Sequence, residues 1–565
     1  MVYKLHTGSI LNCIFYGGLW LSLWILFFYF GHVTGTAHIS LFFKIFSACA
    51  DSSLFVFFLI FLRGKWKYCS LVIPFLISFI LWVNTLYFRN FQDLIPASLY
   101  LTNQAGDETV VSSISNSSRA SDIILLLAPF IPVIITFGLN RRCFVQTKPQ
   151  KLLIIGAFVV LSVSWGITFG GAYRRVSIYH ATSERTKVLK GLYPEFATNW
   201  IFFYDQHNFT GYLFRCIYKS IGTKKILTQR ELIDIKEYLS SKNMDKTTDN
   251  SFSKRNNLVF IVVESMPRKI LELEDRKKYI PVLDSLLNEP MTILSRTLVI
   301  PSYGRSSDAQ FIYNTGLLPL RDEPVVTNHA SKDYPSISKA IGGYSMEIIG
   351  EKGSLWSHNV TNKSYGYDNL ISDIAAKEIN QDSIIFNRAT QELNNLTQPF
   401  FLFISTLSMH DPCLISKVSP RLSPMDLENF KDERDKEYLQ RLSHFDYSLG
   451  TFLQNLKEQG KYDETVIVII GDHEIREECI SEKFYDNSVP LILLNSGKSG
   501  FYKREITQLD IFPSILDILN LNYRFLNVPY SGLGQSIFRY TEDTNESTPS
   551  EEDYKVSEML IRGTY

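Results

Sequence analysis

The residues of this chain that could do chemistry follow three short apolar runs. The run NNLVFIVVES leads into Glu264, PFFLFISTLSMHDP leads into His410, and ETVIVIIGDHE leads into Asp472 and His473. A single Asp or His after a strand is usually a turn or cap residue. Three strand ends that each supply a metal-ligand residue type are hard to obtain by chance. The pattern therefore predicts a metal site that includes Glu264, Asp472 and His473.

Two carboxylates and one imidazole favour a hard or borderline divalent cation. Such a set suits Mn²⁺, Mg²⁺ or Zn²⁺ and does not suit copper or iron–sulfur chemistry. Three protein ligands leave a coordination position open, and a serine hydroxyl placed there becomes acidic because the cation stabilises its alkoxide. We expect one divalent ion, with Mn²⁺ as the first choice and Zn²⁺ or Mg²⁺ as alternatives.

The stretch GRSSDAQ, residues 304–310, offers a candidate nucleophile. Taken alone, it is typical of a helix cap, because Ser and Asp are good N-cap residues. Beside a metal site, however, a serine at a helix N-terminus would also meet backbone amides that favour an incoming anion. We expect Ser306 to be both the nucleophile and a metal ligand, with Ser307 as the second choice.

The apolar runs before these residues are typical of strands buried on both faces of a parallel sheet. Helical segments such as 426–458 separate them, which is the alternation of an α/β domain. In such sheets, sites form just beyond the carboxyl ends of the strands. We therefore expect residues 256–540 to form an α/β domain with a mostly parallel central sheet and a site at one edge.

Apolar residues crowd into the first 172 positions of the 565, and charged residues crowd into the remainder. Five apolar runs, 9–31, 40–62, 69–88, 121–139 and 152–172, are each about as long as a membrane-spanning helix. We expect an α-helical transmembrane domain of five spans at 1–172, a juxtamembrane helical linker at 173–255 and a polar C-terminal tail at 541–565. Within this tail we expect the stretch near 541–553 to be mobile.

Lys and Arg gather on one side of these spans, which the positive-inside rule assigns to the cytoplasm. The two short loops on the opposite side carry only Arg89 and Arg119. We therefore expect a multi-pass protein of the cell (inner or cytoplasmic) membrane, with residues 173–565 outside the cytoplasm. The basic residues on the cytoplasmic side are Lys4, Arg63, Lys65, Lys67, Arg141, Arg142, Lys148 and Lys151.

Two charged residues, Lys44 and Asp51, lie within or at the edge of the second run. A charge inside a membrane is costly and is a functional candidate by default. The two residues are seven apart, so they share a helix face. We favour a structural pair made through a neighbouring span, or a lysine that snorkels to the interface.

Nine short motifs carry a resemblance to a known family. In their type and order the chain resembles the membrane-bound lipoteichoic-acid synthase and phosphoglycerol transferase group of the sulfatase (alkaline phosphatase) superfamily. The motifs, which follow the family order, are NTLYFRNFQDLIP, VVES, GRSSDAQFIYNTGLLPL, WSH, SYGYDNL, TLSMHDP, GDHE, VPLILLNSG and QLDIFPSILDIL.

The resemblance implies a sulfatase-like domain at 256–540, with a metal held by Glu264, Ser306, Asp472 and His473. It also implies that His410 lies near the transferred phosphate. The family nucleophile is a threonine after Gly-Lys, whereas this chain has Ser306 after Gly304 and Arg305. Serine keeps the hydroxyl, so the resemblance implies the same chemistry.

The substrate side of the family pattern is a Trp-Asn-Arg sequence, and here it reads Trp356, Ser357 and His358. We expect Trp356, His358 and Arg305, together with His410, to contact substrate. The alternative for His358 is a surface residue of a polar loop, because SHNVTNKS around it is hydrophilic. An unperturbed histidine titrates near about 6.5, so a substrate contact through His358 would depend on pH.

The resemblance implies a phosphatidyl-lipid:acceptor transferase. A phospholipid would donate phosphoglycerol, or as a second choice phosphoethanolamine, to a cell-envelope glycan, lipid or polymer. One alternative is a hydrolase, either a phosphodiesterase or a sulfatase, although no Cys or Ser starts the C/S-x-P-x-R motif of sulfatases. Another is an inactive membrane sensor of the same fold. A formal net charge of zero gives no reason to expect a nucleic-acid partner.

Two of the cysteines after the membrane runs follow predicted site residues. Cys413 lies three residues after His410, and Cys479 lies six after His473. Those strand ends should be neighbours, and the compartment can be oxidising. A Cys413–Cys479 disulfide and two free thiols both remain open, because sequence does not determine connectivity.

Overall fold

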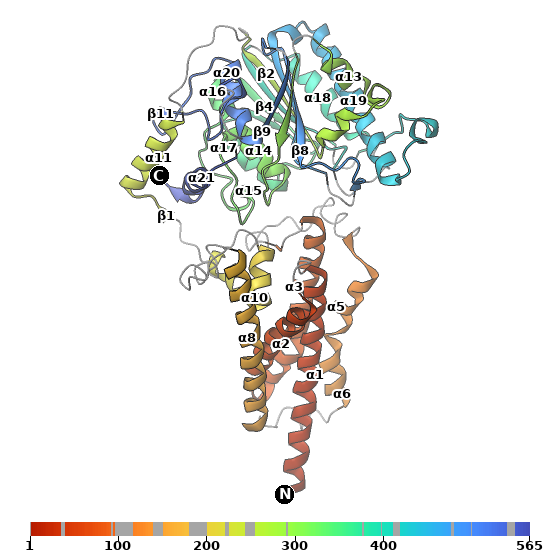
Figure 1. Cartoon of the computed structure of the whole chain (residues 1–565), viewed down its shortest axis with the longest axis vertical. Coiled ribbons are helices and arrows are strands. Elements are labelled where there is room, and N and C mark those ends of the chain that lie inside the picture. Colours follow the sequence, from red (N-terminus) through yellow and green to blue (C-terminus); the bar gives the residue numbers. More distant parts are fainter. Residues whose placement is uncertain are drawn as a thin grey trace. The chain divides into compact units, whose positions relative to one another are not determined.

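The chain forms two compact units, one of residues 1–102 and 110–222 and one of residues 103–109 and 223–565. Figure 1 shows the helical first unit in red to yellow and the mixed second unit in green to blue. The computed structural model describes residues 2–34, 40–91, 94–95, 117–138, 151–179, 200–220, 225–242, 255–289, 292–375, 378–396, 398–410, 418–475, 479–498, 500–539 and 548–565.

The first unit is a set of apolar helices. Among the described residues, four helices are long and apolar enough to cross a membrane, and a fifth span results if a pair of helices bent by 43° counts as one. The long helices are α1 (Val2–Thr34), α2 (Leu41–Leu59), α3 (Cys69–Phe91) and α8 (Lys151–Tyr179), and the bent pair contains α5 (Ile123–Leu127) and α6 (Phe130–Gly138).

Asp51 in α2 caps another helix of this unit. Its carboxylate accepts hydrogen bonds from the amides of Phe209 and Thr210 at 2.9 and 3.1 Å, and from the Thr210 hydroxyl at 2.6 Å. These residues restart helix α10 (Trp200–Ser220) after Asn208, whose φ of 62° breaks it. The predicted Lys44–Asp51 pair is therefore wrong for Asp51, because helix amides supply the compensation for its burial.

An eight-stranded sheet is the centre of the second unit. Its strand order is β5-β4-β6-β2-β7-β8-β3-β9, and the neighbours from β5 to β7 are parallel, whereas β8 runs antiparallel to β7 and β3. This confirms the predicted mostly parallel sheet. The strands are β2 (Asn257–Val263), β3 (Thr292–Leu298), β4 (Tyr344–Ile348), β5 (Asn369–Ile371), β6 (Phe400–Ser405), β7 (Thr465–Gly471), β8 (Ser488–Leu494) and β9 (Gly500–Thr507).

Helices cover both faces of this sheet, as Figure 1 shows. Strand β2 is buried along its whole length, and its alternate residues enter two different cores. One core contains Phe260 with residues of α14 (Ser306–Thr315) and α20 (Ile511–Ile518). The other contains Ile261 with residues of α13 (Pro281–Leu287), α18 (Gln381–Leu393) and α19 (Glu433–Glu458). Burial on both faces explains the uninterrupted apolar run.

The C-terminal segment is a folded part of the second unit. Helix α21 (Glu551–Arg562) begins with a capping box between Ser550 and Asp553, and β12 (Gly563–Thr564) pairs with β1 (Lys225–Ile226). The predicted polar tail is therefore wrong for residues 550–565, which are folded, and the predicted mobility is wrong for residues 550–553. The many charges of this segment hid a narrow apolar face, which consists of Val556, Leu560 and Ile561 and is buried in the core.

We expect Leu560→Ala to destabilise the second unit by roughly 2 to 5 kcal/mol, the usual cost of emptying a buried leucine site. Leu560 is 1% exposed. Lys555→Ala on the exposed side of the same helix should change stability by less than about 0.5 kcal/mol. The measurement is the denaturant midpoint of each purified variant in detergent. Equal midpoints would contradict the packing of α21.

Candidate active site

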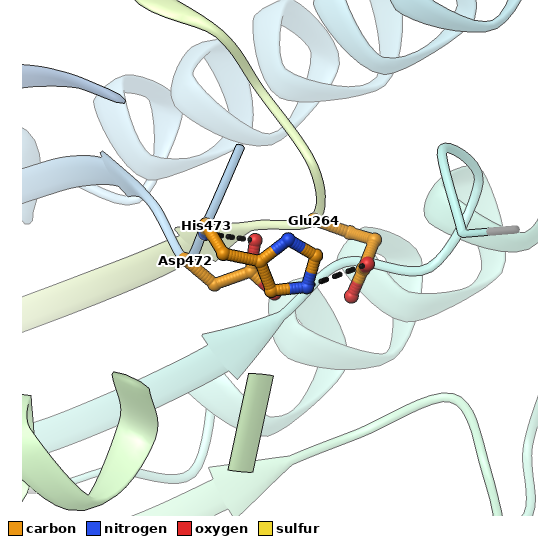
Figure 2. Close-up of side chains that lie close together, drawn as sticks. All are labelled: Glu264, Asp472 and His473. Atoms are coloured by element: carbon orange, nitrogen blue, oxygen red, sulfur yellow. Dashed lines mark hydrogen bonds and ion pairs between the residues drawn. The ribbon is translucent and has the colours of Figure 1, made fainter. Parts of the chain in front are cut away.

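The three predicted metal ligands converge at the carboxyl ends of two neighbouring strands. Val263, at the end of β2, lies opposite Gly471, at the end of β7, so the residues that follow them leave the sheet side by side. Potential ligand atoms of Glu264, Asp472 and His473 all lie within 4.8 Å of one another. Figure 2 shows the three side chains pointing toward one common point.

Electrostatics within this group favour a bound cation. Burial and, after it, the charge of Glu264 raise the pKa of Asp472 well above its ordinary value. The amides of Ser265 and His473 donate to Oδ1 of Asp472 at 2.8 and 2.7 Å, which fixes the carboxylate. Two crowded, buried carboxylates are costly without a positive charge between them. The donor set therefore fits a divalent ion.

Ser306 is the serine that reaches this group. Its hydroxyl donates to Oε2 of Glu264 at 3.2 Å and lies 3.0 Å from Nε2 of His473. Ser307 is buried and donates instead to the backbone carbonyl of Gly304 at 3.0 Å. The structure thus brings the first-choice serine, and not the second, to the predicted ligands.

The turn before Ser306 is strained and tightly held. Arg305 has a φ of 42°, which is uncommon for a residue other than glycine. A Cβ atom on Gly304 would lie 2.4 Å from the Ser307 hydroxyl. The buried carboxylate of Asp308 accepts hydrogen bonds from the amides of Gly304 and Val325 at 2.7 and 3.1 Å. This function of Asp308 is not visible in the sequence, because its hydrogen-bond partners are backbone amides that no residue pattern marks.

The side chain of Arg305 points toward His473. Its Nη2 donates to the carbonyl of Glu474 at 2.7 Å and lies 3.1 Å from Nδ1 of His473. Nδ1 of His473 is 2.8 Å from the same carbonyl, so its proton is best placed there. Nε2 is then left with its lone pair toward Ser306 and the carboxylates, as a metal ligand requires.

One cavity brings most of the predicted site residues together. Trp356 and His358, from the turn and helix start at 355–358, and His410, from the segment after β6, line it beside the metal-ligand candidates. Arg305 is not among its lining residues. The full lining is Val262, Glu264, Ser306, Ser307, Gln310, Ile349, Gly350, Glu351, Trp356, His358, Ser405, Thr406, Leu407, His410 and Asp472.

His358 is buried, so the surface alternative for it is wrong. Its Nδ1 lies 2.9 Å from Oε1 of Glu347, and its Nε2 lies 3.7 Å from Oε1 of Glu351. Burial lowers the pKa of His358, but the charges of the two glutamates and the hydrogen bond to Glu347 outweigh it and leave the pKa above its ordinary value. We therefore expect His358 to titrate above the range of an unperturbed histidine, and the pH dependence of substrate binding stays a prediction. Glu347 was not predicted as a site residue. The sequence signal that could have revealed it is a single charged residue within the apolar stretch YSMEIIG.

The proposed partner of Cys479 lies outside the described residues. Residues 411–417 are not described, so the Cys413–Cys479 disulfide remains a prediction.

Comparisons with known proteins agree with this architecture. Residues 256–521 match the family model described as "Sulfatase", and residues 4–194 match the model described as "Lipoteichoic acid synthase N-terminal domain". The chain thus carries a segment of the lipoteichoic acid synthase N-terminal kind followed by a segment of the sulfatase kind. The chain is a lipoteichoic-acid-synthase-like member of the sulfatase superfamily.

Individual relatives align with most of this chain. Lipoteichoic acid synthase 2 of Bacillus subtilis is 25% identical over 513 residues, which cover 84% of this chain and 75% of that protein. Lipoteichoic acid synthase of Staphylococcus aureus is 22% identical over 503 residues, with 83% and 75% covered. The crystal structure of the lipoteichoic acid synthase LtaP from Listeria monocytogenes aligns over 60% of this chain and 97% of that chain, at 19% identity and a TM-score of 0.42.

Proposed function

We propose that this protein is a membrane-anchored transferase that moves phosphoglycerol from a phospholipid to an envelope glycan, lipid or polymer through a covalent Ser306 intermediate. The names of its relatives support the reaction class. The observation that carries the proposal is the position of the Ser306 hydroxyl, at 3.0 Å from Nε2 of His473 and 3.2 Å from Glu264. A hydroxyl held among metal-ligand types at a helix start is arranged to attack phosphorus.

Glu264, Asp472 and His473 would hold one divalent cation, for which Mn²⁺ is our first choice, with Ser306 as a further ligand. When bound, the ion would lower the pKa of the serine hydroxyl and neutralise charge on the phosphoryl group. Asp472 is kept in place by two backbone amides, and His473 is kept in place by the carbonyl of Glu474. These contacts position the ligands before substrate arrives.

The remaining predicted residues divide into two roles. We assign His410 and Trp356 to the substrate, because both line the cavity that contains Ser306. His410 would donate to a phosphoryl oxygen and Trp356 would pack against the headgroup. We assign Arg305 to the orientation of His473, because its guanidinium hydrogen-bonds the carbonyl beside that ring.

Mass spectrometry of the full-length protein in detergent with defined phospholipids tests the proposal. The protein is incubated with Mn²⁺ and either phosphatidylglycerol or phosphatidylethanolamine, quenched and digested. We expect a phosphoglycerol adduct on the peptide that contains Ser306, with release of diacylglycerol. An adduct of phosphoethanolamine would mean that this headgroup, and not phosphoglycerol, is transferred. Release of free glycerol phosphate in the absence of an acceptor would favour a hydrolase. Absence of any adduct and of diacylglycerol would contradict the proposal.

We further propose that the second unit lies outside the cytoplasm, on the basis of the positive-inside count. Lys555 is exposed on α21, and Lys65 is exposed in the segment between α2 and α3. In intact cells a membrane-impermeant maleimide should label Lys555→Cys and spare Lys65→Cys, with the natural cysteines as background. After the membrane is permeabilised, both should react. The opposite pattern in intact cells would reverse the orientation.

A further inference from the structure

A strained turn presents one histidine to the cavity that contains Ser306. Trp356 and Ser357 have φ values of 49° and 60°, and His358 follows them as the first residue of α17 (His358–Ser364). Left-handed backbone at a residue other than glycine is strained and persists only where the surrounding structure holds it in place. Strain at two successive residues indicates that the direction of the next side chain matters.

A buried carboxylate orients the ring of this histidine. Oε1 of Glu347 accepts the Nδ1 proton of His358 at 2.9 Å, and its other oxygen accepts from Nδ2 of Asn362 at 3.0 Å. Glu347 lies within strand β4 and is 3% exposed, so it cannot swing away. With Nδ1 occupied, Nε2 is the nitrogen that can exchange a proton, and His358 lines the cavity beside Ser306.

We propose that His358 is the general acid and general base of the transfer reaction, with Glu347 as its positioning residue. The inference rests on the transferase function proposed above. A carboxylate that holds an imidazole by one nitrogen, and leaves the other to a reacting group, is the arrangement that proton transfer in catalysis requires. The strained turn and the buried glutamate together supply it.

In the first step, ionised Ser306 attacks phosphorus, and the bond from phosphorus to the diacylglycerol oxygen breaks with its electron pair on that oxygen. Protonated His358 gives its Nε2 proton to this oxygen, so neutral diacylglycerol leaves. In the second step, neutral His358 takes the proton of the acceptor hydroxyl as that oxygen attacks phosphorus. The bond to Ser306 breaks, and both ionised Ser306 and protonated His358 are regenerated.

The charges around His358 suit this order of events. Glu347 faces Nδ1 and Glu351 faces Nε2, while Glu264, Asp472 and His410 line the same cavity. Against the effect of burial, the two neighbouring glutamates hold the pKa of His358 above its ordinary value. The raised pKa favours the protonated ring, which is the form that a general acid needs when the lipid binds.

Leaving-group dependence distinguishes proton transfer from a purely electrostatic role. Full-length wild type, His358→Gln and His358→Arg are each given phosphatidylglycerol in detergent micelles, or bis(4-nitrophenyl) phosphate, whose nitrophenolate leaves without a proton. With the lipid, we expect both variants to release diacylglycerol in a single turnover roughly 10² to 10⁴-fold more slowly. With the nitrophenyl ester, both should stay within about tenfold of wild type. His358→Arg that matches wild type on the lipid, or equal losses on both substrates, would overturn the proposal.

The pH profile tests the role of Glu347. Because the acid form is needed, the single-turnover rate of wild type should fall as pH rises through the raised pKa of His358. Glu347→Gln removes a charge that raises this pKa, so the fall should begin at lower pH. Glu351→Gln, a change at a less buried site, should move it in the same direction. If both variants are slower but their rates fall over the same pH range as that of wild type, the glutamates have a purely structural role. That result would overturn the proposed pairing of Glu347 with His358.

The outcome also separates this inference from the proposed function. If wild type releases diacylglycerol and forms the Ser306 adduct while His358→Arg behaves as wild type, only the acid–base role of His358 fails. If wild type forms no adduct and releases no diacylglycerol, the transferase function fails, and the inference fails with it.

Discussion

Replacing Ser306 with alanine is expected to lower the rate of diacylglycerol release from phosphatidylglycerol by about 10⁴-fold or more, as loss of a covalent nucleophile does in other enzymes. The fold should survive, because Ser306 is half-buried at the start of α14 and its hydroxyl bonds to side chains of the candidate metal site, among them Glu264 and His473. The measurement is a radiolabelled-lipid turnover assay, with the adduct at position 306 followed by mass spectrometry.

Ser307→Ala is the matched control. Like Ser306→Ala, it removes a single serine hydroxyl, but at the adjacent position. The Ser307 hydroxyl donates a hydrogen bond to the carbonyl of Gly304. We expect a loss of about 1 kcal/mol in stability, and activity within roughly tenfold of wild type because the nucleophile is kept. If Ser307→Ala were inactive and Ser306→Ala turned over normally, the assignment of the nucleophile would be wrong.

Asp472→Asn is expected to weaken binding of Mn²⁺ by at least about 100-fold and to lower activity accordingly, with partial rescue at high Mn²⁺ concentration. Asparagine keeps an oxygen that can accept from the amides of Ser265 and His473. The substitution therefore removes the charge while it preserves most of the local structure. Calorimetric titration with Mn²⁺ and the Mn²⁺-induced shift in melting temperature give the readouts.

Asp446→Asn controls for the loss of a buried carboxylate in general. Asp446 also accepts hydrogen bonds from two backbone amides, those of Val282 and Leu283. It lies on α19, outside the metal-ligand group. We expect Mn²⁺ affinity to be unchanged in this variant. Asp472→Asn with the metal content and activity of wild type would remove Asp472 from the site.

Much of the site could be predicted because its residues occupy the ends of recognisable elements. Glu264 and Asp472 each follow an uninterrupted apolar run, and His410 follows a third run after a short mixed stretch. A parallel sheet brings the ends of such runs to one edge. The structure confirms this sheet and places Glu264 and Asp472 after paired residues of β2 and β7. The apolar N-terminal helices were equally visible, because spanning a membrane needs length and composition more than a particular partner.

Other features could not be predicted because they depend on contacts that local pattern does not record. The C-terminal helix α21 carries many charges, and only its packing in the core shows that Leu560 and Ile561 belong to the second unit. Asp51 looked like a partner for a nearby lysine. The structure shows that its partner is a helix start 158 and 159 residues away.

The sequence by itself determined which residue types stand at the strand ends, and therefore the class of chemistry. Only the tertiary structure decided which atoms meet. Adjacent residues on a helix point about 100° apart, so the choice between Ser306 and Ser307 depended on how α14 is held against β2 and β7. The pairing of His358 with Glu347 required a strained turn to bring α17 against β4. Side-chain direction depends on such packing, and packing is a property of the folded chain.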